Sequence, residues 1–211
     1  MKKIRVSFFS ACCLFICSCN VLTTAQSKTF LSLEELVTKA PPSIFDYTTE
    51  GIYEQEKSTL MTKGESENWK IKNRNKQRIV VEAKNPSSKL SLFSVLTKKK
   101  DPTLMNSVLI VFTENERAQN IETLEYKNNA FRNIAAIPKI ETADFFKNSN
   151  AKEIAKKYPN AYSYKLQAEN KGFEVSLSAW QNEELANLKA DYKIKLEWNG
   201  SAFEKQFISI H

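Results

Sequence analysis

The stretch YSYKLQAENKGFEVSLSA, residues 162–179, decides the fold class of this 211-residue chain. Its two ends alternate apolar and polar residues, with the period of two that is typical of half-buried strands. The tripeptide NKG at residues 170–172 separates them and favours a tight turn. The same pattern returns over residues 192–207, where NG at 199–200 marks the turn. The sequence therefore predicts two consecutive antiparallel hairpins near its C-terminal end.

Five further strands are predicted upstream, at residues 69–72, 79–81, 89–96, 108–112 and 121–126. The first alternates apolar with basic residues, and a polar turn over residues 73–76 is expected to lead into the apolar second strand. The segment VLIVF at 108–112 is apolar on both faces, so we expect it in the interior of a sheet.

Short helices are predicted outside these hairpins. Ser32 and Glu35 have the spacing of a capping box, which predicts a helix that ends near Ala40. A second helix is expected over residues 52–63, with Gly64 placed to end it. A third is expected to begin with Asn150 as its cap and to end before Pro159. One or two helical turns are expected between residues 182 and 189. Together these elements predict an α+β fold, an antiparallel sheet of consecutive hairpins with a few short helices packed on it.

Residues 1–25 have the composition of a secretory signal peptide. A basic start, MKKIR, precedes an uncharged apolar stretch over residues 6–16. This stretch is too short for a transmembrane helix, which needs about 20 residues. We therefore expect export to the periplasm, the cell surface or the surrounding medium, without a transmembrane span.

Two cleavage sites stay open. Cleavage after Ala25 would leave Gln26 as the first residue. Alternatively, residues 1–18 form a lipoprotein signal and Cys19 carries a lipid, which would be the protein's attachment to the membrane. In the first case residues 26–211 remain, a size that predicts one α+β domain or two lobes that join near residues 127–140.

The residue inventory excludes most catalytic and metal chemistry. The only histidine is His211, and all four cysteines lie within the first nineteen residues. Serine and cysteine hydrolases need an imidazole beside the nucleophile, and zinc sites draw on cysteine and histidine. The four glycines are isolated, so a phosphate-binding glycine loop is excluded as well. We expect no catalytic residue, no metal and no cofactor, and export argues against a nucleic-acid partner.

Carboxylates are the remaining catalytic candidates, because a glycosidase needs only two of them beside a cleft. The nearest pairs in the sequence are Glu183 with Glu184, and Glu114 with Glu116. Glu183 and Glu184 also suit the first turn of a helix, where the helix dipole favours negative charge. The ordinary interpretation of all four is a solvated surface.

The charge distribution points to one candidate binding surface. Residues 57–100 hold twelve basic and three acidic residues, a net charge of +9. We expect Lys70 and Lys72 on one face of a strand, with Arg74 and Lys76 at the adjoining turn. Such a patch would bind an anionic envelope component or an acidic protein. The alternative is a solvated sheet face whose lysines protect an edge from pairing.

Two tryptophans have two interpretations each. Trp198 and Trp180 lie on or beside alternating strands, where a buried position in the core is commoner than a platform for stacking sugars. We expect Trp198 in the core; Trp180 ends its strand.

The C-terminal segments VSLS at 175–178 and LEWNG at 196–200 resemble a family of short exported Bacteroidetes-type proteins that is classified as a domain of unknown function. Pro138 and the segment DFF at 144–146 fit the same pattern. The resemblance covers the last third of the chain and implies an exported α+β domain with no catalytic residue to carry over. The sequence thus favours an exported, non-catalytic binding or assembly module. The alternatives are a carboxylate-dependent hydrolase of cell-wall glycan and a small inhibitor domain.

Overall fold

A computed structural model describes residues 30–48, 50–85, 88–97, 106–116, 118–167, 172–178 and 182–210. Its helices are α1 (Leu33–Lys39), η1 (Pro42–Phe45), α2 (Glu54–Lys63), η3 (Thr142–Phe145), α3 (Ser149–Lys156) and α4 (Glu183–Ala186). Its strands are β1 (Trp69–Arg74), β2 (Arg78–Ala83), β3 (Ser88–Leu96), β4 (Ser107–Asn115), β5 (Gln119–Lys127), β6 (Ala130–Asn133), β7 (Tyr162–Gln167), β8 (Gly172–Leu177), β9 (Tyr192–Trp198) and β10 (Phe203–Ser209).

The strands form two antiparallel sheets of consecutive hairpins. Strands β1 to β6 make a six-stranded sheet in chain order, and β7 to β10 make a four-stranded sheet, also in chain order. The predicted α+β class is therefore confirmed. Strand β4, the apolar segment of the sequence, lies inside the larger sheet between β3 and β5.

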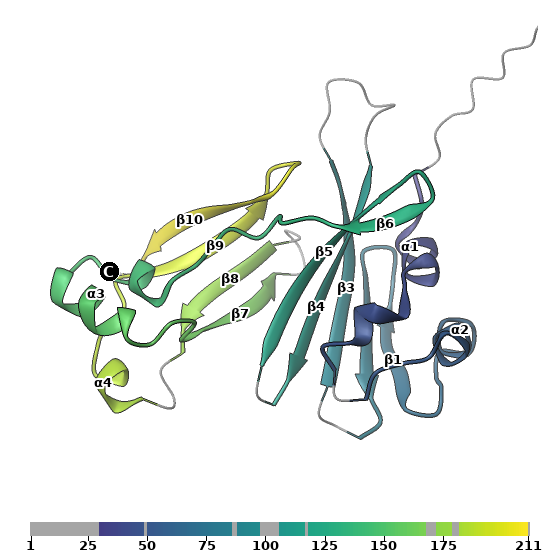
Figure 1. Cartoon of the computed structure of the whole chain (residues 1–211), viewed down its shortest axis with the longest axis horizontal. Coiled ribbons are helices and arrows are strands. Elements are labelled where there is room, and N and C mark those ends of the chain that lie inside the picture. Colours follow the sequence, from purple (N-terminus) through teal and green to yellow (C-terminus); the bar gives the residue numbers. More distant parts are fainter. Residues whose placement is uncertain are drawn as a thin grey trace, which may run out of the picture.

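The six-stranded sheet is the middle layer of three, with α1 and α2 on one face and the four-stranded sheet on the other (Figure 1). Alternation along each central strand supplies apolar side chains to both faces, which explains why β4 is apolar throughout. Leu109 and Val111 pack with the helices, whereas Val108 and Ile110 pack with the second sheet. Both faces of β4 are thereby removed from water.

Phe173 lies at the centre of the core between the two sheets. Its ring contacts the rings of Phe112 from the larger sheet and Phe203 from the smaller one, at centroid distances of 5.4 and 5.7 Å. Trp198 packs at the margin of this core, as expected, and donates a hydrogen bond from Nε1 to the carbonyl of Leu96 at 3.0 Å. Trp180 lies outside the described residues.

The predicted helix signals are largely confirmed. Ser32 and Glu35 form the capping box of α1, and Gly64 ends α2 in the left-handed conformation, with a φ of 82°. The predicted cap at Asn150 is wrong. Asn148 caps α3 instead, because its side chain accepts hydrogen bonds from two backbone N–H groups of the first turn.

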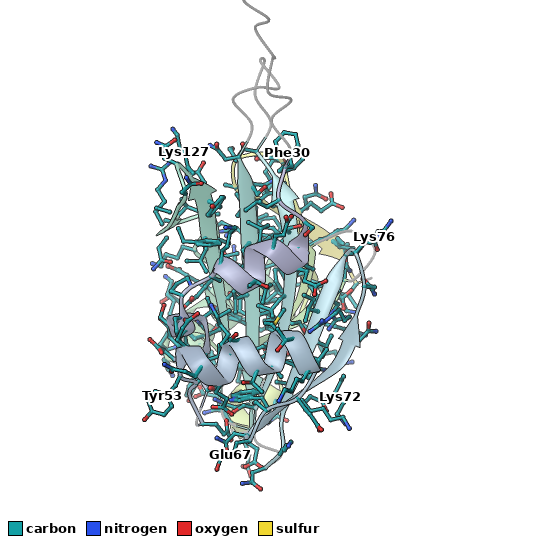
Figure 2. All side chains as sticks on the ribbon, turned by 90° about the vertical axis from the view of Figure 1, so that its right-hand side faces the viewer. Phe30, Tyr53, Glu67, Lys72, Lys76 and Lys127 are labelled. Atoms are coloured by element: carbon teal, nitrogen blue, oxygen red, sulfur yellow. The ribbon has the colours of Figure 1, made fainter. Side chains whose placement is uncertain are left out.

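Lys57 joins α2 to the end of α1. Its side chain is buried, and Nζ donates to the carbonyls of Thr38, at 3.0 Å, and Ala40. It also forms an ion pair of 3.4 Å with the exposed Glu54. The ammonium group therefore satisfies carbonyls that the end of α1 leaves without partners inside the helix. Figure 2 shows the two helices side by side across the sheet.

The chain crosses from the larger to the smaller sheet between Asn133, the end of β6, and Thr142, the start of η3. The backbone N–H of Phe203 donates to the carbonyl of Ala136 in this crossing, at 2.8 Å. The division of residues 26–211 into one domain or two lobes stays a prediction. Among the described residues, no helix is long and apolar enough to cross a membrane.

Candidate functional site

A wide cleft lies between the two sheets. Its volume is about 970 Å³, and the β4–β5 hairpin forms one wall. The start of β7 and the ends of α3 and α4 form the other. The lining residues are mostly amides, hydroxyls and aromatic rings: Asn115, Glu116, Ala118, Gln119, Asn120, Ile121, Ile137, Lys157, Tyr158, Pro159, Asn160, Ala161, Tyr162, Ser163, Tyr164, Ser178, Asn182 and Leu185. We call this space the inter-sheet cleft.

Gln119 connects the two walls. Its Nε2 donates to the carbonyl of Tyr164 at 3.1 Å, and its Oε1 accepts from the N–H of Tyr164 at 2.7 Å. The side-chain amide thus pairs with β7 as a peptide group of a neighbouring strand would. A further hydrogen bond of 3.2 Å joins Nε2 to the carboxylate of Glu114. This one side chain fixes the distance between the larger sheet and the edge of the smaller one.

Three tyrosines, Tyr158, Tyr162 and Tyr164, give the cleft its aromatic surface. Tyr162 and Tyr164 lie on one face of β7 with their rings 5.6 Å apart and nearly perpendicular. Burial raises the pKa of Tyr164, so its phenol stays neutral at physiological pH. The hydroxyl of Tyr162 lies within hydrogen-bond distance of the side-chain oxygen of Asn160 and the carbonyl of Ile140, at 3.2 and 3.3 Å. The two rings and the Tyr162 hydroxyl therefore form an aromatic and hydrogen-bonding surface along the cleft.

The structure brings both predicted carboxylate pairs to the borders of this cleft. Glu184 accepts from the hydroxyl of Tyr158 at 2.6 Å and from Lys157 at 3.3 Å. The Tyr158 hydroxyl, together with Lys157, lowers the pKa of Glu184, so this carboxyl stays ionised and is a poor proton donor. Its neighbour Glu183 is exposed in the first turn of α4, the ordinary position for such a charge.

The opposite pair has the contacts of an ordinary polar surface. Glu114 accepts from Gln119 and lies 3.8 Å from the Nζ of Lys89. Glu116 lines the cleft, but it is exposed at the hairpin end. Glycoside hydrolysis needs a carboxylic acid with a raised pKa beside the bond to be cleaved. The pKa of Glu184, beside the cleft, is shifted in the opposite direction.

One carboxyl with a raised pKa does occur, on the helix-covered face of β5. Burial, and then the charge of Asp46, raise the pKa of Glu122, while a hydrogen bond from Tyr47 opposes the shift. Glu122 is not among the residues that line the cleft, so it offers no acid for chemistry there.

The four predicted anion-binding residues do not form one patch. A bulge between Ile71 and Asn73 changes the alternation of β1, so Arg74 pairs opposite Ile79 and lies on the helix-covered face. Its guanidinium donates to the carbonyl of Met61 at 2.7 Å and pairs with Glu34 at 3.1 Å. The expectation that Arg74 belongs to the turn is wrong, because the strand continues through the bulge to this residue.

The other three lysines lie along the outer side of β1. Lys70 is in register with Glu82, and Lys72 forms an ion pair of 3.2 Å with the same carboxylate. Lys76 lies in the turn that follows, and Figure 2 shows Lys72 and Lys76 on the same side of the molecule. Of these three lysines, Lys70 and Lys76 have no ion pair with another described residue, whereas Lys72 has one.

Charges alternate across strands β1 to β4 on the face of the larger sheet opposite α1 and α2. Register places Lys70 opposite Glu82, Glu82 opposite Lys89, and Lys89 opposite Glu114. Opposite charges in adjacent strands stabilise a sheet and cancel much of each other's field. This row makes the surface beside β1 less basic than the composition of residues 57–100 predicts.

The remaining sequence predictions concern groups beyond this site. Cys19, the predicted lipid attachment point, lies outside the described residues. No cluster of three or more metal-binding side chains occurs in the described ranges.

A scan against protein-family models, a search of curated proteins and a search of solved structures returned no match. The resemblance of the C-terminal segments to a family of exported proteins stays a prediction.

Sequence reasoning missed the cleft because its residues come from several segments that lie far apart in the chain. Gln119 follows a turn and has no pattern of its own in the sequence. Tyr162 and Tyr164 were visible as the apolar positions of a strand, but their alternation did not indicate which edge of the sheet stays open.

Proposed function

We propose that this protein is an exported, non-catalytic binding module of the cell envelope or of the secreted fraction, and that its ligand lies in the inter-sheet cleft. The observation that carries the proposal is the combination of a large cleft lined mostly by amides, hydroxyls and aromatic rings with two bordering carboxylates, Glu114 and Glu184, that are already paired. Binding sites commonly combine aromatic surface with a few oriented polar groups. Export rests on the N-terminal sequence alone.

The hydrolase alternative is less well supported. Glu184, the carboxylate with the strongest hydrogen bonds beside the cleft, has a lowered pKa and accepts from Tyr158 and Lys157. A general acid needs the opposite shift. The proposal therefore predicts that a bound ligand leaves the protein unchanged.

The test uses two probes, chitohexaose and a capped hexapeptide of alternating valine and serine, in calorimetric titrations. Ser163 and Lys165 lie on the same face of β7, but only Ser163 lines the cleft. Ser163→Trp should weaken binding of whichever probe binds by at least tenfold, and Lys165→Trp should leave it unchanged. Equal effects of the two variants would overturn the proposal, and so would a change in the mass of the probe after incubation.

A second proposal concerns an anionic envelope component or an acidic protein at the outer side of β1. Lys70 and Lys76 support it, because both are exposed and neither has an ion pair among the described residues. Vesicles that contain phosphatidylglycerol should sediment the wild-type protein at low salt and release it as ionic strength rises. The paired change Lys70→Glu and Lys76→Glu should abolish this sedimentation, and its persistence would refute the proposal.

A further inference from the structure

Strand β6 covers only half of its neighbour β5. The pairs run from Lys127 with Ala130 to Leu124 with Asn133. One more hydrogen bond follows, from the N–H of Ile134 to the carbonyl of Thr123 at 2.9 Å. The N–H of Ala136 then donates to the carbonyl of Ile134, so the chain turns away from the sheet. Among the described residues, no strand lies beside the first part of β5 on this side.

The direction of the exposed peptide groups follows from the hydrogen bonds that flank them. Asn115 donates its N–H to the carbonyl of Ala118, so the even-numbered positions of β5 face β4. The carbonyl of Thr123 faces the opposite way, toward Ile134. Because the two directions alternate along an antiparallel strand, the N–H and C=O groups of Gln119 and Ile121 face the open side.

This open side is the wall of the inter-sheet cleft, since Gln119 and Ile121 both line it. The opposite wall has the same property. The backbone N–H and C=O groups of Tyr164 point away from β8 and pair with the Gln119 side chain. Those of Tyr162, two residues earlier, therefore point the same way, into the cleft. The cleft thus lies between two strand edges, and the Gln119 side chain already occupies one pairing position.

The side chains around these edges suit an uncharged ligand. Lys157 is the only cation among the described lining residues, and it is paired with Glu184. Ile121 and Ile137 pack partly buried beside the tyrosines, which leaves apolar surface for alternate side chains of an extended chain. An anionic ligand would find no unpaired cation in this part of the structure.

We propose that the ligand of the inter-sheet cleft is an uncharged, extended peptide segment that adds as a strand to the open half of β5. The N–H and C=O groups of Gln119 and Ile121 form the backbone hydrogen bonds, and Tyr162 with Ile137 contacts alternate side chains. Strand addition to an open sheet edge is a general mode of peptide recognition. This inference rests on the proposed binding function and specifies its ligand.

The experiment compares three probes by titration of ¹⁵N-labelled mature protein. These are the capped valine–serine hexapeptide, the same peptide with methyl groups on its four inner backbone nitrogens, and chitohexaose. Methylation keeps the side chains but removes the donors that pair with a strand. We expect the unmodified peptide to shift the amide signals of Gln119 and Ile121, and the methylated peptide to bind at least tenfold more weakly.

A protein variant gives a second measurement. Ile121→Pro removes one N–H group from the open side of β5, a change that edge strands accommodate. It should weaken peptide binding by at least fivefold relative to Ile121→Val, which also alters the side chain but keeps the N–H group. The dispersed amide spectrum of each variant checks that it is folded.

The outcomes separate this inference from the function on which it rests. Equal binding of the two peptides would overturn strand addition. Binding of chitohexaose alone, with the same amide shifts, would also overturn it and would leave the binding function standing. If no probe at millimolar concentration shifts an amide signal of residues 115–121 or 157–164, both proposals fail.

Discussion

Gln119→Glu is the most informative change at the junction of the two sheets, because it replaces one side-chain atom and keeps the size of the residue. Its Oε1 position can still accept from the N–H of Tyr164, but at neutral pH the carboxylate no longer donates to the carbonyl of Tyr164. The lost hydrogen bond is worth about 1 kcal/mol. The replaced nitrogen lies 3.2 Å from the carboxylate of Glu114, so two negative charges also meet.

The repulsion follows from this distance. Two unit charges at 3.2 Å interact with about 1 kcal/mol in water and about 5 kcal/mol at an effective dielectric constant of 20. The side chain of Glu114 is 34% exposed, so solvent screening places the value near the lower figure. Together with the lost hydrogen bond, Gln119→Glu should lower the free energy of unfolding by about 2–3 kcal/mol at pH 7.

The penalty should depend on pH. Neighbouring negative charge raises the folded-state pKa of the new carboxyl, so the destabilisation appears as pH rises above its unfolded pKa of about 4.3. Below that pH the protonated carboxyl donates again, and the variant should regain most of its stability. Urea unfolding at pH 3.5 and pH 7 measures both values, with the exposed Gln77→Glu as the control. Equal destabilisation at both pH values would refute the role assigned to the Gln119 amide.

Three further predictions concern other parts of the chain. Lys57→Met should lower the free energy of unfolding by about 2–4 kcal/mol, because it leaves two carbonyls without their charged donor. Lys63→Met, an exposed change in the same helix, is the control and should change this free energy by less than about 0.5 kcal/mol. Urea titrations measure both. Because the folded-state pKa of Glu122 is raised, this carboxyl favours folding below pH 4.5, and its contribution is lost as pH rises. Glu122→Gln should therefore gain stability over the wild type between pH 5 and 8, as measured by thermal unfolding. If the difference in melting temperature between variant and wild type stays constant over this range, the burial of the Glu122 charge is contradicted. Intact-mass measurement of envelope material should find a mature protein that begins at Gln26 or at a lipidated Cys19. Cys19→Ala should release the protein from membranes only in the second case. A protein that still begins at residue 1 would refute export.

The hairpins were predictable because their alternation matches the two faces of each strand. Strand β4 could be placed in the interior from its continuous apolar run. The start of α1 could be predicted from Ser32, and the end of α2 from Gly64. These signals are local. Each depends on residues within one turn or one strand, so the sequence expresses them directly.

Strand β6 was missed although its turn has a local signal. Asn128 and Asn129 both have positive φ, 52° and 61°, and join β5 to β6 as a two-residue turn. Asparagine tolerates this conformation better than most residues, so an Asn-Asn pair after a strand favours a hairpin. The strand itself, residues 130–133, is short and mostly exposed, which leaves no apolar alternation to detect.

The candidate site was beyond sequence reasoning for a different reason. The bulge in β1 removes Arg74 from the predicted basic face, and strict alternation gives no sign of a bulge. The cleft depends on the angle at which the second sheet packs and on the point where the chain leaves β6. Both follow from tertiary packing among distant segments.

The position of the bound hexapeptide tests the central claim most directly. Intermolecular nuclear Overhauser effects between the capped valine–serine peptide and the labelled protein report which protons lie within about 5 Å of it. The account predicts contacts from the peptide backbone to the amide proton of Ile121, and from its side chains to the ring of Tyr162. Contacts confined to the outer side of β1, near Lys70 and Lys76, or to the exposed surface of α1 and α2, would contradict it.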